Sequence, residues 1–167
     1  MMPAGRTSSS HRPSRCDRVI EPHRREIGIL ANSGLFLAEQ AAILATLSDR
    51  ARKKVRVRIC IRDPLATDIA HGSAKPGSID TRASRQDEAL ERFAPLRGSG
   101  AAEIRVHRAV LNNSICRGDD ELLVGQYAYG ISAGQSPVLH LRLTDSGEIV
   151  STYLESFERV WASSRPS

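Results

Sequence analysis

The polar stretch at residues 111–130, LNNSICRGDDELLVGQYAYG, holds the side chains whose types and spacing are closest to a chemical site. It is typical of a strand, a turn rich in Gly and Asp, and a second, apolar strand. Asn112, Ser114 and Asp119 occupy positions i, i+2 and i+7 of this stretch. Phosphodiester cleavage through a covalent intermediate would need an imidazole nucleophile, a second acid/base imidazole and a cation that holds the phosphate oxygens. An amide and a hydroxyl supply none of these, so the hairpin predicts a site without catalysis.

His107 is a second candidate, because it ends an expected strand and precedes Arg108. Together with Arg105 it could bind a phosphate or a carboxylate through charge-assisted hydrogen bonds. The simpler interpretation is a hydrogen-bonded histidine that fixes the following loop. Asp63, which precedes a proline, ends another strand, where α/β folds often place ligands. We expect a pocket where the loop at His107, the strand at residues 112–119 and the strand end at Asp63 converge.

The other polar groups have simple structural explanations. The acidic turn at residues 119–121 could hold a cation, but Asp and Gly are expected in any hairpin turn. Tyr127 and Tyr129 could line a pocket, although packing in the core is the simpler account. The histidines lack metal-ligand spacing such as His-x3-His, and the three cysteines form no C-x-x-C pair. We expect no metal and no cofactor, and the odd cysteine count favours a reducing, cytoplasmic location.

Charge is distributed unevenly along the 167 residues, whose net charge is +5. Residues 1–25 contain six Arg against two acidic residues, which leaves 18 basic and 17 acidic side chains elsewhere (24 − 6 and 19 − 2). We therefore expect a disordered basic leader at residues 1–24, a folded domain at residues 25–162 and a tail at residues 163–167. No apolar run approaches the roughly 20 residues that cross a bilayer, so no membrane partner is expected.

Strand and helix patterns alternate from residue 26 onward. Residues 55–61, VRVRICI, alternate apolar with polar side chains, which predicts a strand with one buried face. Strands are expected at residues 26–31, 55–61, 103–107, 113–117, 121–124 and 138–143, and helices at 39–54, 80–93 and 148–161. This order predicts an α/β fold in which a mixed sheet is flanked by helices.

Five segments taken together resemble one known domain. They are GLFL at 34–37, VRVRICIRDP at 55–64, EIRVHRAVLNNSICRGDDELLVGQYAYG at 103–130, PVLHLR at 137–142 and TYLESFERVW at 152–161. They resemble an uncharacterised actinobacterial domain usually found C-terminal to a Cro/repressor-type helix-turn-helix, and that domain looks like one half of a phospholipase D-like fold. The resemblance covers about residues 24–162. It implies a phospholipase D-like half-domain with a regulatory or sensing role and without assigned catalytic residues.

The hairpin differs from these relatives at several positions. Phospholipase D enzymes carry His-x-Lys-x4-Asp in the frame where this chain has Asn112, Ser114 and the later aspartate. The relatives resemble LYNSIYR, with Tyr at the positions of Asn112 and Cys116, and tend to an Asn-x-His pair at Gly125 and Tyr127. They also carry an N-terminal helix-turn-helix, for which residues 1–24 are too short and too polar.

We therefore expect a non-catalytic ligand-sensing or interaction domain of a transcriptional-regulator family, separated from its DNA-binding part. The alternatives are a residual phosphodiesterase or phosphoryl-transfer hydrolase, and a non-functional gene remnant. The expected partners are a small-molecule or phosphate-bearing ligand and a second copy in a homodimer. DNA would bind only weakly through the Arg-rich leader, or through a separate helix-turn-helix partner. The candidate ligand-binding residues are His107, Arg105, Asn112, Ser114, Asp119 and Asp63.

Overall fold

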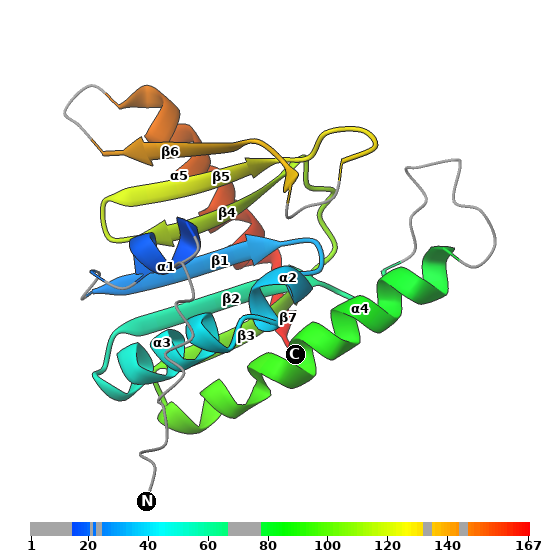
Figure 1. Cartoon of the computed structure of the whole chain (residues 1–167), viewed down its shortest axis with the longest axis horizontal. Coiled ribbons are helices and arrows are strands. Elements are labelled where there is room, and N and C mark those ends of the chain that lie inside the picture. Colours follow the sequence, from blue (N-terminus) through cyan, green and yellow to red (C-terminus); the bar gives the residue numbers. More distant parts are fainter. Residues whose placement is uncertain (1–14, 21, 23–24, 67–77, 132–134, 144–146) are drawn as a thin grey trace, which may run out of the picture.

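The computed structural model describes residues 15–20, 22, 25–66, 78–131, 135–143 and 147–167 (Figure 1). Its centre is a seven-stranded sheet in the order β6-β5-β4-β1-β2-β3-β7. The strands are β1 (Glu26–Ala31), β2 (Arg56–Arg62), β3 (Ala102–His107), β4 (Asn113–Gly118), β5 (Glu121–Gln126), β6 (Val138–Arg142) and β7 (Arg165–Pro166). The helices are α1 (Arg15–Ile20), α2 (Leu35–Ala38), α3 (Ala41–Arg52), α4 (Ser78–Phe93), the 3-10 helix η1 (Ala94–Ser99) and α5 (Glu148–Ser163).

Two kinds of connection build the mixed sheet. Strands β1, β2 and β3 are parallel, because α2 and α3 connect the first pair and α4 and η1 connect the second. Strands β4, β5 and β6 form an antiparallel meander attached to β1. The expected α/β fold with a mixed, helix-flanked sheet is confirmed. The carboxyl ends of β1–β3, the start of β4 and the end of β5 consequently lie at one edge, here called the carboxyl edge.

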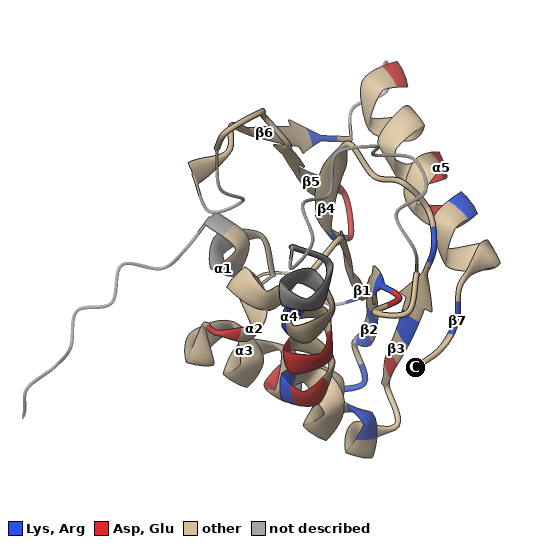
Figure 2. Cartoon of the chain, turned by 90° about the vertical axis from the view of Figure 1, so that its right-hand side faces the viewer, with Lys and Arg blue, Asp and Glu red and all other residues tan. Residues whose placement is uncertain are grey.

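Helices cover both faces of the sheet. Helices α1–α4 lie on one side and α5 lies on the other, as the edge-on view in Figure 2 shows. Each side has its own apolar cluster, with Phe93 in the first and Phe157 in the second. The prediction of a single buried face for residues 55–61 is therefore wrong. Arg58 and Cys60, read as solvent-facing, are buried beneath α5.

Arg58 can be buried because every part of its guanidinium has a partner. Its side chain is only 4% exposed, and it forms a bidentate pair with Glu158 at 2.6 and 2.8 Å and an ion pair with Glu26. Its Cζ also lies 4.9 Å from the ring centroid of Phe157 and 5.1 Å from that of Trp161. Ion pairs and cation–π contacts therefore fasten α5 to the sheet.

The ends of the described chain are more ordered than the sequence suggested. Residues 15–20, expected within a disordered leader, form α1, whose Val19 and Ile20 are 2% and 0% exposed in the core. Residues 1–14 lie outside the described residues. The expected tail also contains a strand, because β7 pairs with β3 and the Ser167 amide donates to the Ile104 carbonyl at 3.2 Å. Both corrections concern short segments that gain order from contacts distant in sequence.

No helix in the described part of the chain is long and apolar enough to cross a membrane.

Candidate functional site

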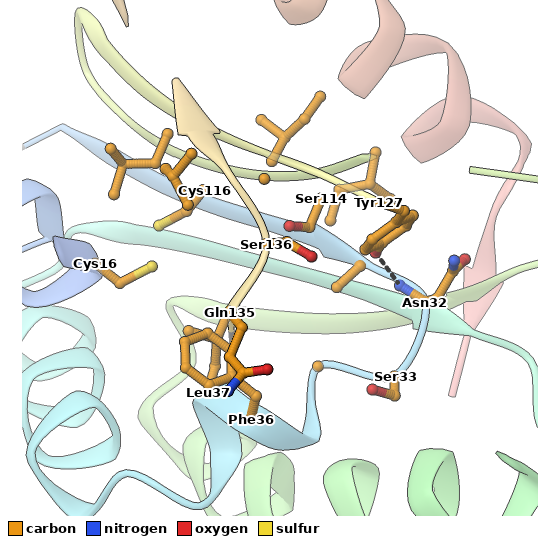
Figure 3. A pocket seen from close by; sticks show the side chains of 17 residues that line it. Cys16, Asn32, Ser33, Phe36, Leu37, Ser114, Cys116, Tyr127, Gln135 and Ser136 are labelled. Atoms are coloured by element: carbon orange, nitrogen blue, oxygen red, sulfur yellow. Dashed lines mark hydrogen bonds between the residues drawn. The ribbon is translucent and has the colours of Figure 1, made fainter. Parts of the chain in front are cut away.

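Two neighbouring cavities open at the carboxyl edge, on the side of the sheet that α1–α4 cover. The first, here called the neutral cavity, has a volume of about 500 Å³ (Figure 3). Its polar lining residues are Asn32, Ser33, Ser114, Tyr127, Gln135 and Ser136, and most of the rest are apolar. None of its lining residues in the described part of the chain is Asp, Glu, Lys, Arg or His.

The second cavity, here called the arginine cavity, has a volume of about 590 Å³. It contains two cationic side chains, Arg62 from the end of β2 and Arg85 from α4, and Asn112, on the chain leading into β4, also lines it. Arg62 is 8% exposed, and its Nη1 donates to the Ala109 carbonyl at 2.9 Å. The arginine cavity can therefore attract an anionic group.

Asn32, Ser33 and Tyr127 line both cavities and form the boundary between them. The Tyr127 hydroxyl accepts a hydrogen bond from the Asn32 amide at 3.3 Å, drawn as a dashed line in Figure 3. The Asn32 carbonyl accepts bonds from the Arg62 amide at 3.1 Å and from Nε2 of the buried Gln86 at 3.3 Å. Hydrogen bonds to the Asn32 backbone from three segments distant in sequence thus hold this boundary in place.

Two unusual polar groups lie at this boundary. Burial raises the pKa of Tyr127. Hydrogen bonds with the Asn32 backbone and the Ser114 side chain lower this pKa, but by a smaller amount. The phenol is therefore neutral near pH 7. The Asn32 Oδ1 oxygen is buried and accepts no hydrogen bond from the described residues. A buried acceptor of this kind usually meets a donor from water or a ligand.

Ser114 reaches the neutral cavity because Gly125 lies beside it on β5. A Cβ at position 125 would come within 2.7 Å of the Ser114 Oγ. Glycine therefore leaves the serine hydroxyl free to face the cavity. Asn112 and Ser114, two of the six predicted site residues, do line the cavities, one in each.

His107 is placed differently from the prediction. It is 1% exposed and lines neither cavity, and its Nε2 lies 3.1 Å from the Ala31 carbonyl. Burial lowers its pKa more than the Ala31 carbonyl raises it, and the positive charge of Arg62 lowers it further. A neutral, buried histidine fits the simpler interpretation of a residue that fixes the strand end, and its side chain is not placed to meet a ligand in either cavity.

Asp63 is buried beneath its own ion pairs. Its Oδ2 accepts from Arg108 and Arg165, each at 3.0 Å. Burial raises the pKa of Asp63, but the Leu65 amide and the two guanidinium groups outweigh burial and hold the pKa below its ordinary value. Since Asp63 lines neither cavity, its role in the described structure is to join the end of β2 to the loop after β3 and to β7.

Arg105 and Asp119 lie away from the carboxyl edge cavities. Arg105 points to the α5 side, where its Cζ lies 4.6 Å from the Trp161 ring centroid. Asp119 lies in the β4–β5 turn at the opposite edge of the sheet. Its Oδ1 accepts from the amides of Arg25 at 3.2 Å and Glu26 at 2.9 Å, so the turn anchors the start of β1. The side chains of Asp63, Arg105, His107 and Asp119 therefore line neither cavity. The segments expected to converge do meet, because the arginine cavity is lined by residues 62 and 64, by residues 110 and 111 of the loop after His107, and by Asn112.

Tyr127 is the site residue that sequence reasoning assigned to the core. Of the predicted tyrosine pair, Tyr127 lines both cavities and Tyr129 is fully exposed at the rim of the arginine cavity. Strand β5 ends at Gln126, so the two tyrosines do not share a strand face. Within the described ranges, no group of three His, Cys, Asp or Glu side chains is placed to hold a metal ion.

Comparisons with known proteins identify the fold alone. No family model and no curated protein matches the sequence. TrmBL2, an archaeal chromatin protein described for its mode of DNA binding, is similar in structure with a TM-score of 0.56 and 12% identity, over 90% of this chain. This chain spans only about half (48%) of that protein's length. Nuc, a phospholipase D family member from Salmonella typhimurium, is similar with a TM-score of 0.55 and 15% identity, over 91% of this chain and 88% of Nuc.

Proposed function

We propose that this chain is a non-catalytic ligand-sensing module that binds an anionic small molecule in the arginine cavity without cleaving it. The observation that carries the proposal is the identity of the hairpin residues at the cavities. Asn112 and Ser114 stand where a phosphodiesterase of this fold would carry its imidazole and its ammonium group. Neither an amide nor an aliphatic hydroxyl can form the covalent phosphoryl intermediate expected of an imidazole.

The nearby histidine does not replace the missing nucleophile. His107 is buried and bonded to a backbone carbonyl, and it lines neither cavity. The lining residues of both cavities in the described part of the chain include no histidine and no lysine. His71 and Lys75 lie outside the described residues. The groups that remain can bind a ligand, and binding without turnover is what a sensor requires.

A regulatory role is the part of the proposal that rests on likeness. The segments that resemble a regulator domain cover most of the described chain, and the fold is shared with a chromatin protein as well as with Nuc. Fold alone does not assign function, so the regulatory role depends on the demonstration of a ligand.

Bis(4-nitrophenyl) phosphate tests binding and catalysis with one compound. Calorimetry should detect its binding, and absorbance of released nitrophenolate should stay at the buffer rate. Arg85→Met should weaken binding roughly tenfold, because one charge-assisted hydrogen bond contributes about 1.5–3 kcal/mol. Arg92→Met is the matched control on the same helix, since Arg92 pairs with Glu88 and lines neither cavity.

Three outcomes would contradict the proposal. Turnover above buffer that disappears in His107→Ala would favour a residual hydrolase. Binding that Arg85→Met and Arg92→Met reduce equally would show that the arginine cavity is not the site. A broad, non-cooperative urea transition would favour a non-functional remnant, because a single domain of this size is expected to unfold cooperatively.

A further inference from the structure

The neutral cavity differs in chemistry from the arginine cavity beside it. Its lining residues in the described ranges carry no formal charge, so none of them could neutralise an ionised ligand group. Moving an ion into such a space removes its hydration without a compensating partner, which is strongly unfavourable. We propose that the neutral cavity is a separate subsite for an uncharged, mainly apolar group that carries one hydroxyl group. This inference rests on the proposed ligand-sensing function and names the chemistry of its second subsite.

The apolar part of the subsite comes from several elements. Phe36 and Leu37 of α2, Ile115 of β4, Leu123 of β5 and Val138 of β6 line the space. Its volume of about 500 Å³ is within the roughly 300–1,000 Å³ typical of small-molecule sites. A fused two-ring hydrocarbon is therefore small enough to enter, and contact with these side chains would favour its transfer from water.

Apart from the amide side chains of Asn32 and Gln135, the polar part consists of hydroxyl groups. Figure 3 shows the side chains of Ser114, Ser136 and Tyr127 around one end of the cavity. The Tyr127 hydroxyl already accepts from the Asn32 amide, and it shares a hydrogen bond with Ser114. Because this bond lowers the pKa of Tyr127, Ser114 is its donor, and the serine oxygen can still accept a proton from a ligand hydroxyl. Ser114 would thus select one hydroxyl group on an otherwise apolar ligand.

Gly125 is a specificity-determining residue in this arrangement. Because a Cβ at this position would lie 2.7 Å from the Ser114 Oγ, any larger residue turns the hydroxyl away or fills the cavity beside it. Gly125 therefore leaves room for the ligand oxygen beside Ser114. The uncharged wall disfavours the binding of ligands that carry a charge.

A pair of naphthalene probes separates charge from shape. Calorimetry at pH 7 should show that 1-naphthol binds at least tenfold more tightly than 1-naphthoate, since the two differ mainly in the ionised carboxylate. Ser114→Ala should weaken 1-naphthol roughly fivefold, the effect of one hydrogen bond, and Ser114→Leu should abolish binding by filling the space. Ser151→Leu, at an exposed position on α5, is the matched control and should leave affinity unchanged.

The outcomes distinguish this inference from the proposed function. Equal or tighter binding of 1-naphthoate, or 1-naphthol binding that survives Ser114→Leu, would overturn the neutral subsite. Failure of both naphthalenes to bind while bis(4-nitrophenyl) phosphate still binds would also overturn it, and would leave the arginine cavity and the sensing function standing. Thermal unfolding of each variant without a probe shows whether a lost signal reflects a lost fold.

Discussion

Replacement of Arg58 with methionine is the strongest test of how α5 is held on the sheet. The change removes a buried cation from Glu26 and Glu158 and from the faces of two aromatic rings. Removal of one partner from a buried ion pair typically costs about 3–5 kcal/mol. Arg117 remains 2.8 Å from the Glu158 carboxylate and 3.6 Å from that of Glu26, so part of the compensating charge stays. We therefore expect a loss near the lower limit, about 3 kcal/mol.

The assay can use the only tryptophan of the chain. Trp161 is buried beside Arg58, so its fluorescence should report separation of α5 from the sheet. Urea unfolding should show a lower midpoint with an unchanged slope. In a thermal scan the same loss corresponds to roughly 6–12 °C, because about 1 kcal/mol shifts the midpoint of a chain of this size by 2–4 °C.

An exposed arginine on the same helix provides the control. Arg159, also on α5, pairs with Glu155 at 2.7 Å but is 76% exposed. Its replacement by methionine should change stability by less than about 1 kcal/mol, as for other exposed ion pairs. If Arg58→Met cost no more than Arg159→Met, the ion pairs and ring contacts around Arg58 would not be what fastens α5.

Three other substitutions or measurements examine separate parts of the fold. Gly28→Ala should lower the free energy of unfolding in urea by about 1–3 kcal/mol, because the new Cβ would lie 2.7 Å from the Arg117 side chain. Gly98→Ala is the control, because a Cβ there would have no neighbour within 4 Å and no steric destabilisation is expected. Burial raises the pKa of Cys60 to about 11, so Ellman's reagent at pH 8 should modify it only after unfolding, and mass-spectrometric detection of the adduct in native protein would contradict this. The pKa of His107 is lowered in the folded protein, so the unfolded chain binds a proton more readily below about pH 6.5 and stability should fall as the pH falls toward 5. His107→Gln should weaken this pH dependence of stability. An unchanged dependence would show that His107 is not its source.

Periodicity and turn residues predicted most of the fold. The predicted strands at 26–31, 103–107 and 113–117 match β1, β3 and β4 within one residue, because each is a short apolar run between polar turns. The same patterns could not show that α5 covers the second face of the sheet. The alternation in VRVRICI suggested a solvent-facing row, whereas Arg58 on that row is buried by ion pairs formed with Glu26 and a residue one hundred positions later.

The site was predicted only in part for the same reason. Asn112 and Ser114 were found from the hairpin frame, because spacing along one hairpin is a local property. Arg105 and His107 were misplaced, since the orientation of β3 side chains depends on which helices pack on each face. The signal for Tyr127 was present in Gly125-x-Tyr127, but its meaning depends on the Asn32 turn, which is distant in sequence.

The early position of α1 has a consequence for the folding of the nascent chain. Val19 and Ile20 share the first apolar cluster with Cys116 of β4 and Leu123 of β5. About 100 residues separate α1 from β5, so at roughly 5–20 residues per second α1 waits about 5–20 s before these partners are synthesised. During that interval its apolar side chains can meet α3 but not the meander. Ribosome-bound chains that stop before β5 should therefore keep α1 open to chaperones and proteases, and its docking should be among the last steps that close the domain.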